Sequence, residues 1–98
     1  MAVYLIANIN VTNPEGFKAY SAQVPALVAK HGGRYLVRGG NVDAKEGGDL
    51  FNRVVVIEFP NRAAANAFYG DPEYQPVLAI RLANAEGHLA LISGVDEP

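Results

Sequence analysis

The chain has 98 residues, half of them hydrophobic, which is enough for one core, and we expect a single domain over residues 1–98. Eight basic and ten acidic residues are scattered without runs, which argues against nucleic acid or an anionic membrane surface as a partner. The lack of cysteine excludes disulfide bonds and thiolate chemistry, and no segment has the roughly 20 apolar residues that span a bilayer. We therefore expect a cytoplasmic protein.

The first predicted element is a strand over residues 2–11 (AVYLIANINV). This segment is rich in β-forming residues, and near its start both alternating positions are apolar, which is typical of a strand buried on both faces. It has no basic region and is interrupted by Asn8, so it does not resemble a signal peptide. Pro14 then follows Asn13 as at many helix starts, and apolar residues recur at helical spacing, which predicts a helix over residues 14–31.

The middle of the chain predicts a β-hairpin. Residues 34–38 (RYLVR) form a short strand, and the glycine pair at 39 and 40 indicates a bulge or bend after it. A second glycine pair at 47 and 48 is typical of a turn. Residues 51–59 (FNRVVVIEF) contain four consecutive β-branched residues and form the second strand, which is also apolar on both faces.

A pair of helices and a last strand are predicted after Pro60. Asn61 is a typical N-cap for a helix that runs to Tyr69. The sequence GDPE stops this helix, and a second helix follows, with an apolar stripe that begins at Tyr74. Residues 88–95 (HLALISGV) form the last strand.

The order of these elements is strand, helix, strand, strand, helix pair, strand. This is the ferredoxin-like βαββαβ order, so we predict an α+β fold with a four-stranded antiparallel sheet and the helices on one face. Strands one and three lie in the middle of such a sheet, and they are the two most apolar strands of the chain. Their second apolar face needs a cover, because each exposed Val, Ile or Leu forfeits about 1.5–3 kcal/mol of burial. We therefore predict a homodimer through the sheet face.

Three segments in this order and spacing resemble a known bacterial family. They are GGRYLVRGG, VVVIEFP and FYGDPEYQPVLAIRLANA, and the family is called domain of unknown function 1330, a branch of the dimeric α+β barrel superfamily. The resemblance implies a ferredoxin-like protomer that pairs through its sheet, and it implies no activity. The superfamily also includes cofactor-independent monooxygenases, haem-degrading enzymes and muconolactone isomerases, which is an analogy of fold alone.

Glu58 is the one acidic residue in the apolar run VVVIEF. In an antiparallel pair it lies on the same face as Arg34 or Arg38, depending on whether the glycines after residue 38 introduce a bulge that shifts the register. One interpretation is a structural ion pair at the sheet edge or dimer seam. The other is a catalytic pair, in which Arg38 binds a ligand carboxylate or enolate oxygen and Glu58 transfers a proton.

Several polar aromatic residues are candidates for ligand binding. Tyr20, Tyr35, Tyr74 and Arg81 are predicted to converge over one end of the sheet, and Tyr74 and Arg81 lie two helical turns apart on one face. They would form a polar rim around an apolar cavity for an aromatic or short-chain acid. The alternative is ordinary packing, with the hydroxyls bonded to backbone or solvent.

No metal and no cofactor are expected. His31 and His88 lie far apart in the sequence with no acidic residue at ligand spacing, and His31 fits the end of a helix. No glycine pair opens a helix after a strand, as nucleotide motifs require, and the strand FNRVVVIEF lacks the exposed aromatics of an RNA-binding sheet.

Two classes of function stay open. One is a small-molecule enzyme, such as a cofactor-independent oxygenase or an isomerase, with Arg38, Glu58, Tyr74 and Arg81 in its cleft. The other is a noncatalytic dimeric binding or structural module. A closed pocket of several hundred cubic ångströms near Arg38 favours the enzyme, whereas a cleft filled by Tyr and Phe rings favours the module.

Overall fold

The computed structural model describes residues 1–96, apart from the side chain of Asp49. The elements in chain order are β1 (Val3–Val11), α1 (Pro14–Lys30), β2 (Arg34–Arg38), the short 3-10 helix η1 (Gly48–Leu50), β3 (Arg53–Phe59), α2 (Arg62–Tyr69), α3 (Tyr74–Asn84) and β4 (Ala85–Ser93). This is the predicted order. The largest boundary differences are the starts of two strands: β3 begins at Arg53 rather than Phe51, and β4 begins at Ala85, directly after α3, rather than at His88. In addition, β4 ends at Ser93 rather than Val95, and β1 and α1 are each one residue shorter than expected.

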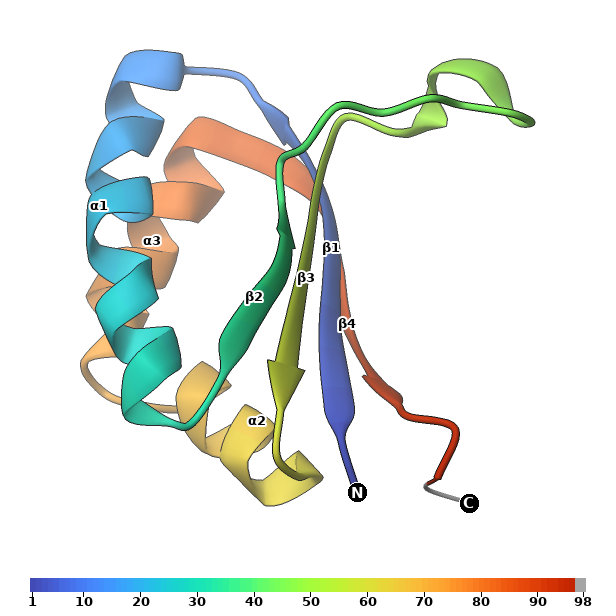
Figure 1. Ribbon diagram of the computed structural model, residues 1–98. Helices are drawn as coiled ribbons and strands as arrows, with labels where there is room; N and C mark the ends of the chain where they lie inside the picture. Colours follow the sequence, from blue (N-terminus) through green and yellow to red (C-terminus); the bar gives the residue numbers. More distant parts are fainter. Residues whose placement is uncertain (97–98) are drawn as a thin grey trace.

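The four strands form one antiparallel sheet in the order β2-β3-β1-β4. The two most apolar strands, β1 and β3, therefore lie in the middle, as the sequence predicts. All three α-helices cover the same face of the sheet (Figure 1). The predicted ferredoxin-like α+β fold is thereby confirmed.

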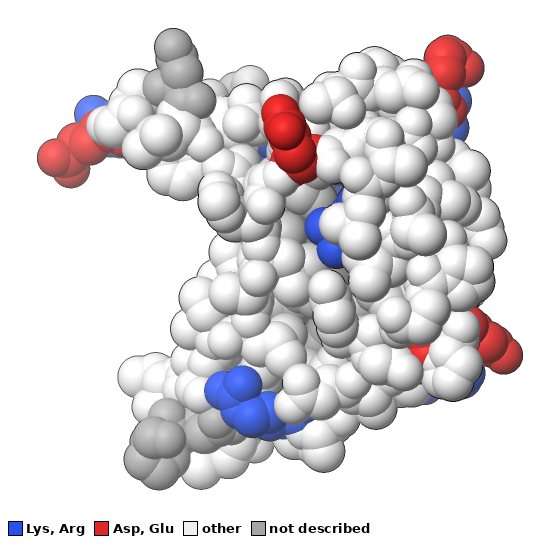
Figure 2. Space-filling model, turned by 180° about the vertical axis from the view of Figure 1, so that it is seen from behind, with Lys and Arg blue, Asp and Glu red and all other residues white. Residues whose placement is uncertain are grey.

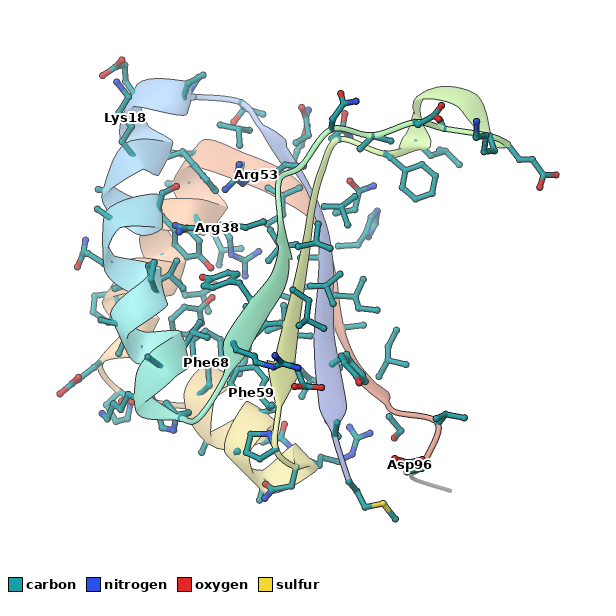
Figure 3. The ribbon with its side chains drawn as sticks, in the orientation of Figure 1. Lys18, Arg38, Arg53, Phe59, Phe68 and Asp96 are labelled. Carbon is teal, nitrogen blue, oxygen red and sulfur yellow. The ribbon has the colours of Figure 1, made fainter. Side chains whose placement is uncertain are left out.

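The core lies between the sheet and this helical layer. Alternate residues of the central strands face the helices and are buried; they are Val3, Leu5, Ala7 and Ile9 on β1 and Val55, Ile57 and Phe59 on β3. At one end of this layer the ring centres of Phe59 and Phe68 lie 5.5 Å apart, and that of Phe68 lies 4.5 Å from Tyr74. Figure 3 shows Phe59 and Phe68 at this end, with Arg38 and Arg53 nearer the other end.

A buried carboxylate joins α1 to the turn between α2 and α3. The Asp71 side chain accepts a hydrogen bond from Lys30 Nζ at 2.8 Å and one from the backbone N–H of Glu73 at 2.9 Å, and it contacts His31 Nε2 at 2.8 Å. The hydrogen bond from Lys30, with those from His31 and Glu73, holds the pKa of Asp71 well below its usual range. His31 follows the last residue of α1, as predicted.

A β-bulge in β2 determines where its two arginines point. Tyr35 pairs with Ile57, but the next paired residue is Val37, opposite Val56, so Leu36 is the extra residue. The bulge therefore lies inside the strand and not at the glycine pair after it. Because of this extra residue, Tyr35 and Arg38 both lie on the helix-covered face, paired with core residues of β3, and Arg34 lies on the opposite face.

No helix of residues 1–96 covers the opposite face of the sheet, which is apolar at its centre. Val37, Val56, Ile6 and Ala90 lie in one row across the four strands. Ile6 and Val37 are 37% and 40% exposed, respectively. We call this the uncovered face, and Figure 2 shows it in profile as a hollow with mostly uncharged residues. The predicted second apolar face is therefore present.

The segment of residues 39–52, between β2 and β3, projects away from the body of the molecule on the side without helices (Figure 1). The side chain of Asn8 on β1 fixes the end of this segment that precedes β3. Its amide group donates a hydrogen bond to the carbonyl oxygen of Leu50 at 2.5 Å, and its oxygen accepts one from the backbone N–H of Asn52 at 2.8 Å. The predicted hairpin is present, with a connection longer than the expected turn.

Candidate ligand-binding site

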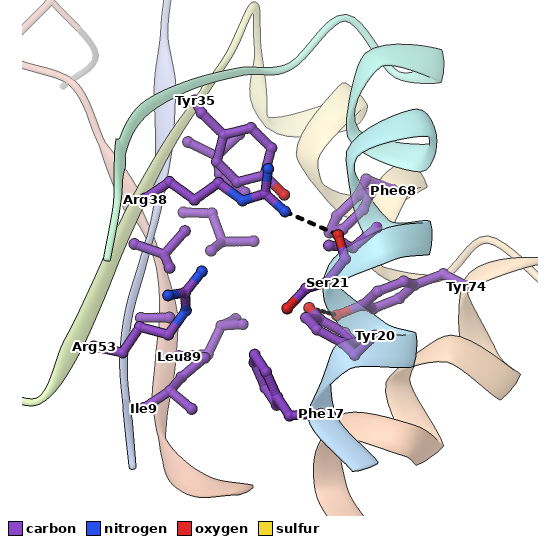
Figure 4. A pocket seen from close by; sticks show the side chains of 15 residues that line it. Ile9, Phe17, Tyr20, Ser21, Tyr35, Arg38, Arg53, Phe68, Tyr74 and Leu89 are labelled. Atoms are coloured by element: carbon purple, nitrogen blue, oxygen red, sulfur yellow. Dashed lines mark hydrogen bonds between the residues drawn. The ribbon is translucent and has the colours of Figure 1, made fainter. Parts of the chain in front are cut away.

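A pocket lies between the sheet and the helices, against α1 (Figure 4). Its walls are apolar and aromatic, and its polar groups come from two arginines, three tyrosines and a serine. The lining residues are Leu5, Ala7, Ile9, Phe17, Tyr20, Ser21, Val24, Tyr35, Arg38, Arg53, Val55, Ile57, Phe68, Tyr74 and Leu89. None of these described residues is acidic, so the pocket is positively charged and suited to an anion.

The free space in the pocket is narrow. The cavity itself has a volume of about 30 Å³, inside a recess of about 460 Å³ that includes the part open to solvent. This cavity holds a few water molecules at most and is far smaller than the roughly 300–1,000 Å³ of common ligand pockets. The aromatic rings fill most of the room between the layers, so an occupant has to be thin or has to displace side chains at the mouth.

Arg38 crosses the mouth of the pocket from β2 to α1. Its Nη2 donates a hydrogen bond to the carbonyl oxygen of Ser21 at 2.9 Å, and its guanidinium carbon lies 4.9 Å from the centre of the Tyr35 ring (Figure 4). One of the two interpretations of the sequence has Arg38 in a pocket between the sheet and the helices, and Arg38 does line this pocket.

Arg53 is the residue that the sequence analysis missed. It is the first residue of β3 and lies on the same face as Val55, Ile57 and Phe59, with its guanidinium carbon 5.9 Å from the centre of the Phe17 ring. Its alternation with those core residues was a usable signal, because a residue two positions before a buried valine points into the same layer.

The three candidate tyrosines come together as expected. The hydroxyl groups of Tyr20 and Tyr74 are hydrogen-bonded at 3.0 Å, and Tyr35 lies on the opposite wall (Figure 4). Burial, with the neighbouring Tyr74 hydroxyl, raises the pKa of Tyr20 far above its ordinary value, and burial also raises the pKa of Tyr35. Both hydroxyl groups are protonated at neutral pH, as ordinary tyrosines are, and the raised pKa keeps them so at higher pH as well.

Arg81 lies behind Tyr20 and does not line the pocket. It is 8% exposed, its guanidinium carbon lies 5.8 Å from the centre of the Tyr20 ring, and its Nε has no hydrogen-bond partner among the described residues. A buried cation without a compensating charge adds to the positive potential of its surroundings. Arg81 therefore favours an anion in the pocket without lying in its wall.

Glu58 lies on the uncovered face, away from Arg38. Its carboxylate accepts a hydrogen bond from Arg34 Nε at 2.6 Å and one from the Tyr4 hydroxyl at 3.2 Å. The hydrogen bond from Arg34 lowers the pKa of Glu58. Of the two alternatives, Glu58 thus pairs with Arg34, because the bulge at Leu36 turns Arg38 to the other face. The structure does not bring Arg38 and Glu58 together in one pocket.

The two histidines lie at separate places. His31 contacts the carboxylate of Asp71, and His88 is exposed on β4 opposite Asn8. Within the described part of the chain, no group of three or more His, Cys, Asp or Glu side chains is arranged to hold a metal ion. No helix in this part is long and apolar enough to cross a bilayer.

A single helical layer on a four-stranded antiparallel sheet, with a pocket between them, defines a protein of the ferredoxin-like α+β fold. Residues 2–95 match the family described as domain of unknown function (DUF1330). The chain therefore belongs to this family, as the resemblance of its three motifs implies. No curated protein matches the chain in sequence.

Solved structures of several bacterial proteins have the same fold. The protein of unknown function RPA0582 from Rhodopseudomonas palustris is 17% identical, with a TM-score of 0.80 over 99% of this chain and 84% of that one. SnoaB, a cofactor-independent oxygenase from Streptomyces nogalater, is 19% identical, with a TM-score of 0.64 over 95% and 92% of the two chains. Rv0793 from Mycobacterium tuberculosis is 20% identical, with a TM-score of 0.57 over 99% and 98%. These identities establish the shared fold alone.

Proposed function

We propose that this protein binds a small organic acid in the pocket between the sheet and α1. The observation that carries the proposal is the composition of the pocket wall: aromatic and aliphatic side chains around two guanidinium groups, with no acidic residue among the described lining residues. An apolar slot with a few convergent polar groups is the usual form of a small-molecule site. The positive charge of buried Arg81, behind Tyr20, adds to the potential that favours an anionic ligand.

The narrow cavity favours a noncatalytic binding function over an enzyme. Rings of Phe17, Tyr20, Tyr35, Phe68 and Tyr74 occupy most of the interlayer space and leave a cavity of about 30 Å³. The proposed ligand therefore keeps its carboxylate at the arginines near the mouth and inserts only a thin apolar part. Glu58, the proposed proton-transfer residue, would have to act from the opposite face, which the pairing with Arg34 disfavours.

A thermal-shift screen tests the binding proposal. We expect monocarboxylates such as butyrate and benzoate to raise the melting temperature with increasing concentration, as any ligand of the native state does. The neutral analogues butyramide and benzamide serve as controls and should have a much smaller effect. Equal shifts with acids and amides, or no shift with any of them, would exclude an organic-acid site.

We also propose that the protein is a homodimer joined through the uncovered faces of two sheets. The central row of Val37, Val56, Ile6 and Ala90 is the surface that such a contact would bury. Full burial of an exposed large aliphatic side chain stabilises a protein by about 1.5–3 kcal/mol, and each of these partly exposed side chains would contribute a fraction of that. An isologous contact supplies the same apolar surface from both copies and leaves neither one exposed.

Sedimentation velocity at micromolar protein tests the dimer. We expect the wild type to sediment as a dimer and Ile6→Lys as a monomer, because the substitution places a charge in the middle of the contact. Leu82→Lys is the matched control, since Leu82 is 64% exposed on α3 in the helical layer, and it should stay dimeric. A monomeric wild type, or a dimer that both variants retain, contradicts the proposal.

A further inference from the structure

The two arginines of the pocket differ in what they already bind. Arg38 donates to the carbonyl oxygen of Ser21 and lies over the Tyr35 ring. The side chain of Arg53 makes no hydrogen bond and no ion pair with any of the described residues, and its ring contact is with Phe17. One guanidinium therefore connects two elements of the fold, and the other has its N–H donors available.

Because of this difference, a carboxylate should bind one arginine at a lower free-energy cost than the other. If Arg38 turned toward a ligand, the Ser21 carbonyl would lose its donor, and an unpaired polar group offsets part of the new interaction. Arg53 loses no partner when it binds. Its planar fork matches the two oxygens of a carboxylate, so it can donate two parallel hydrogen bonds.

Gly39 and Phe17 hold the Arg53 guanidinium between them. A Cβ atom at Gly39 would overlap Nη1 of Arg53, so the absence of a side chain at this position makes the room that the guanidinium occupies. The Phe17 ring lies on the pocket side, 5.9 Å from the guanidinium carbon. Figure 4 shows the Arg53 side chain extending from β3 into the pocket, toward α1. A charged group held in this way is oriented before a ligand arrives.

From these contacts we infer that Arg53 is the residue that binds the carboxylate, and that Arg38 is a positioning residue that fastens β2 to α1 across the mouth of the pocket. The inference rests on the proposed binding function and specifies its ligand as a monocarboxylate with a flat, narrow apolar body. The carboxylate lies on the Arg53 fork, and the body lies along the Phe17 ring toward Ile9 and Leu89.

Isothermal titration with benzoate, and with benzamide as its neutral analogue, tests this assignment. In Arg53→Gln we expect benzoate affinity to fall at least tenfold and to approach that of benzamide. Arg53→Lys keeps the charge without the fork and should give an intermediate affinity. Arg38→Gln should keep the preference for benzoate over benzamide while its melting temperature falls. Arg62→Gln, on α2 and outside the pocket, removes the same kind of side chain and should bind like the wild type.

The two proposals fail in different ways. If the wild type binds neither compound, the organic-acid site itself is refuted, and the role of Arg53 with it. If the wild type prefers benzoate and Arg53→Gln and Arg53→Lys keep that preference, only the assignment to Arg53 is wrong. Loss of the preference in Arg38→Gln, with folding retained by circular dichroism, would transfer the carboxylate to Arg38.

Discussion

Substitution of Gly39 by alanine should weaken ligand binding without removing any charge or hydrogen-bonding group. Gly39 has a φ of +67°, in the left-handed region that alanine adopts at a cost of about 1–2 kcal/mol. The new methyl group would also overlap Nη1 of Arg53, and since this atom is at the end of a flexible side chain, the guanidinium would swing away. The variant is therefore expected to fold with lower stability and with Arg53 displaced.

The expected magnitudes follow from these two effects. The backbone cost lowers the melting temperature by roughly 4–8 °C for each kcal/mol in a domain of this size. A hydrogen bond to a charged group contributes about 1.5–3 kcal/mol, so losing the oriented fork of Arg53 should reduce benzoate affinity about tenfold or more. Gly40→Ala is the matched control: a Cβ there has no atom within 4 Å, and it should change neither binding nor stability by much.

A double-mutant cycle with Arg53→Gln distinguishes displacement of the Arg53 guanidinium from a general loss of stability as the cause of weaker binding. If Gly39 acts through the guanidinium, Gly39→Ala should cost no further benzoate affinity once Arg53 is glutamine. The stability loss should persist in that background, because its origin is the backbone. An undiminished affinity in Gly39→Ala, or an equal loss of affinity in both backgrounds, would refute the reasoning.

Three other outcomes are expected. Tyr20→Phe removes one member of the 3.0 Å hydroxyl pair with Tyr74 and should lower the free energy of unfolding in urea by about 1 kcal/mol; an unchanged value would mean that water replaces the bond. Asp71 has a lowered pKa in the folded state, so its stabilising effect is present above the ordinary value of 3.8 and is lost as the pH falls through the folded value. The stability difference between wild type and Asp71→Asn should thus be full at pH 6–7 and shrink below about pH 4, and a difference that grows in acid would contradict this. Glu58→Gln should leave benzoate affinity within about twofold in titration, because Glu58 lies across the sheet from the pocket.

The sequence was sufficient for the fold because hydrophobic pattern and helix boundaries agreed. Both faces of β1 and β3 are apolar, which places them in the middle of the sheet, and Asn13 and Asn61 cap the helices that follow. The start of β4 was predicted wrongly because the β-propensity of its first residues is weak. Ala85 and Glu86 have little β-propensity, but the backbone of β4 pairs with Val11 and Asn10 there, so the strand starts directly after α3.

The candidate site was predictable only in part. The tyrosines converge as expected, because Tyr20 and Tyr74 lie on the buried faces of their helices and Tyr35 faces them from β2. The arginine that pairs with Glu58 depends on the register between β2 and β3, which the amino-acid sequence leaves open. Glycines suggested a bulge after residue 38, whereas the extra residue is Leu36, which has no special backbone preference.

The bulge in β2 explains why a strand of five residues has an arginine at each end. Residues four apart in a regular strand point to the same face, so Arg34 and Arg38 would both lie beside Glu58 or both in the pocket. The extra residue Leu36 reverses the alternation between them. Arg34 thereby neutralises Glu58 on the uncovered face, and Arg38 reaches α1 on the other. A regular strand would leave either the carboxylate without its cation or the mouth of the pocket without its connection to α1, so this one-residue irregularity is a requirement of the arrangement.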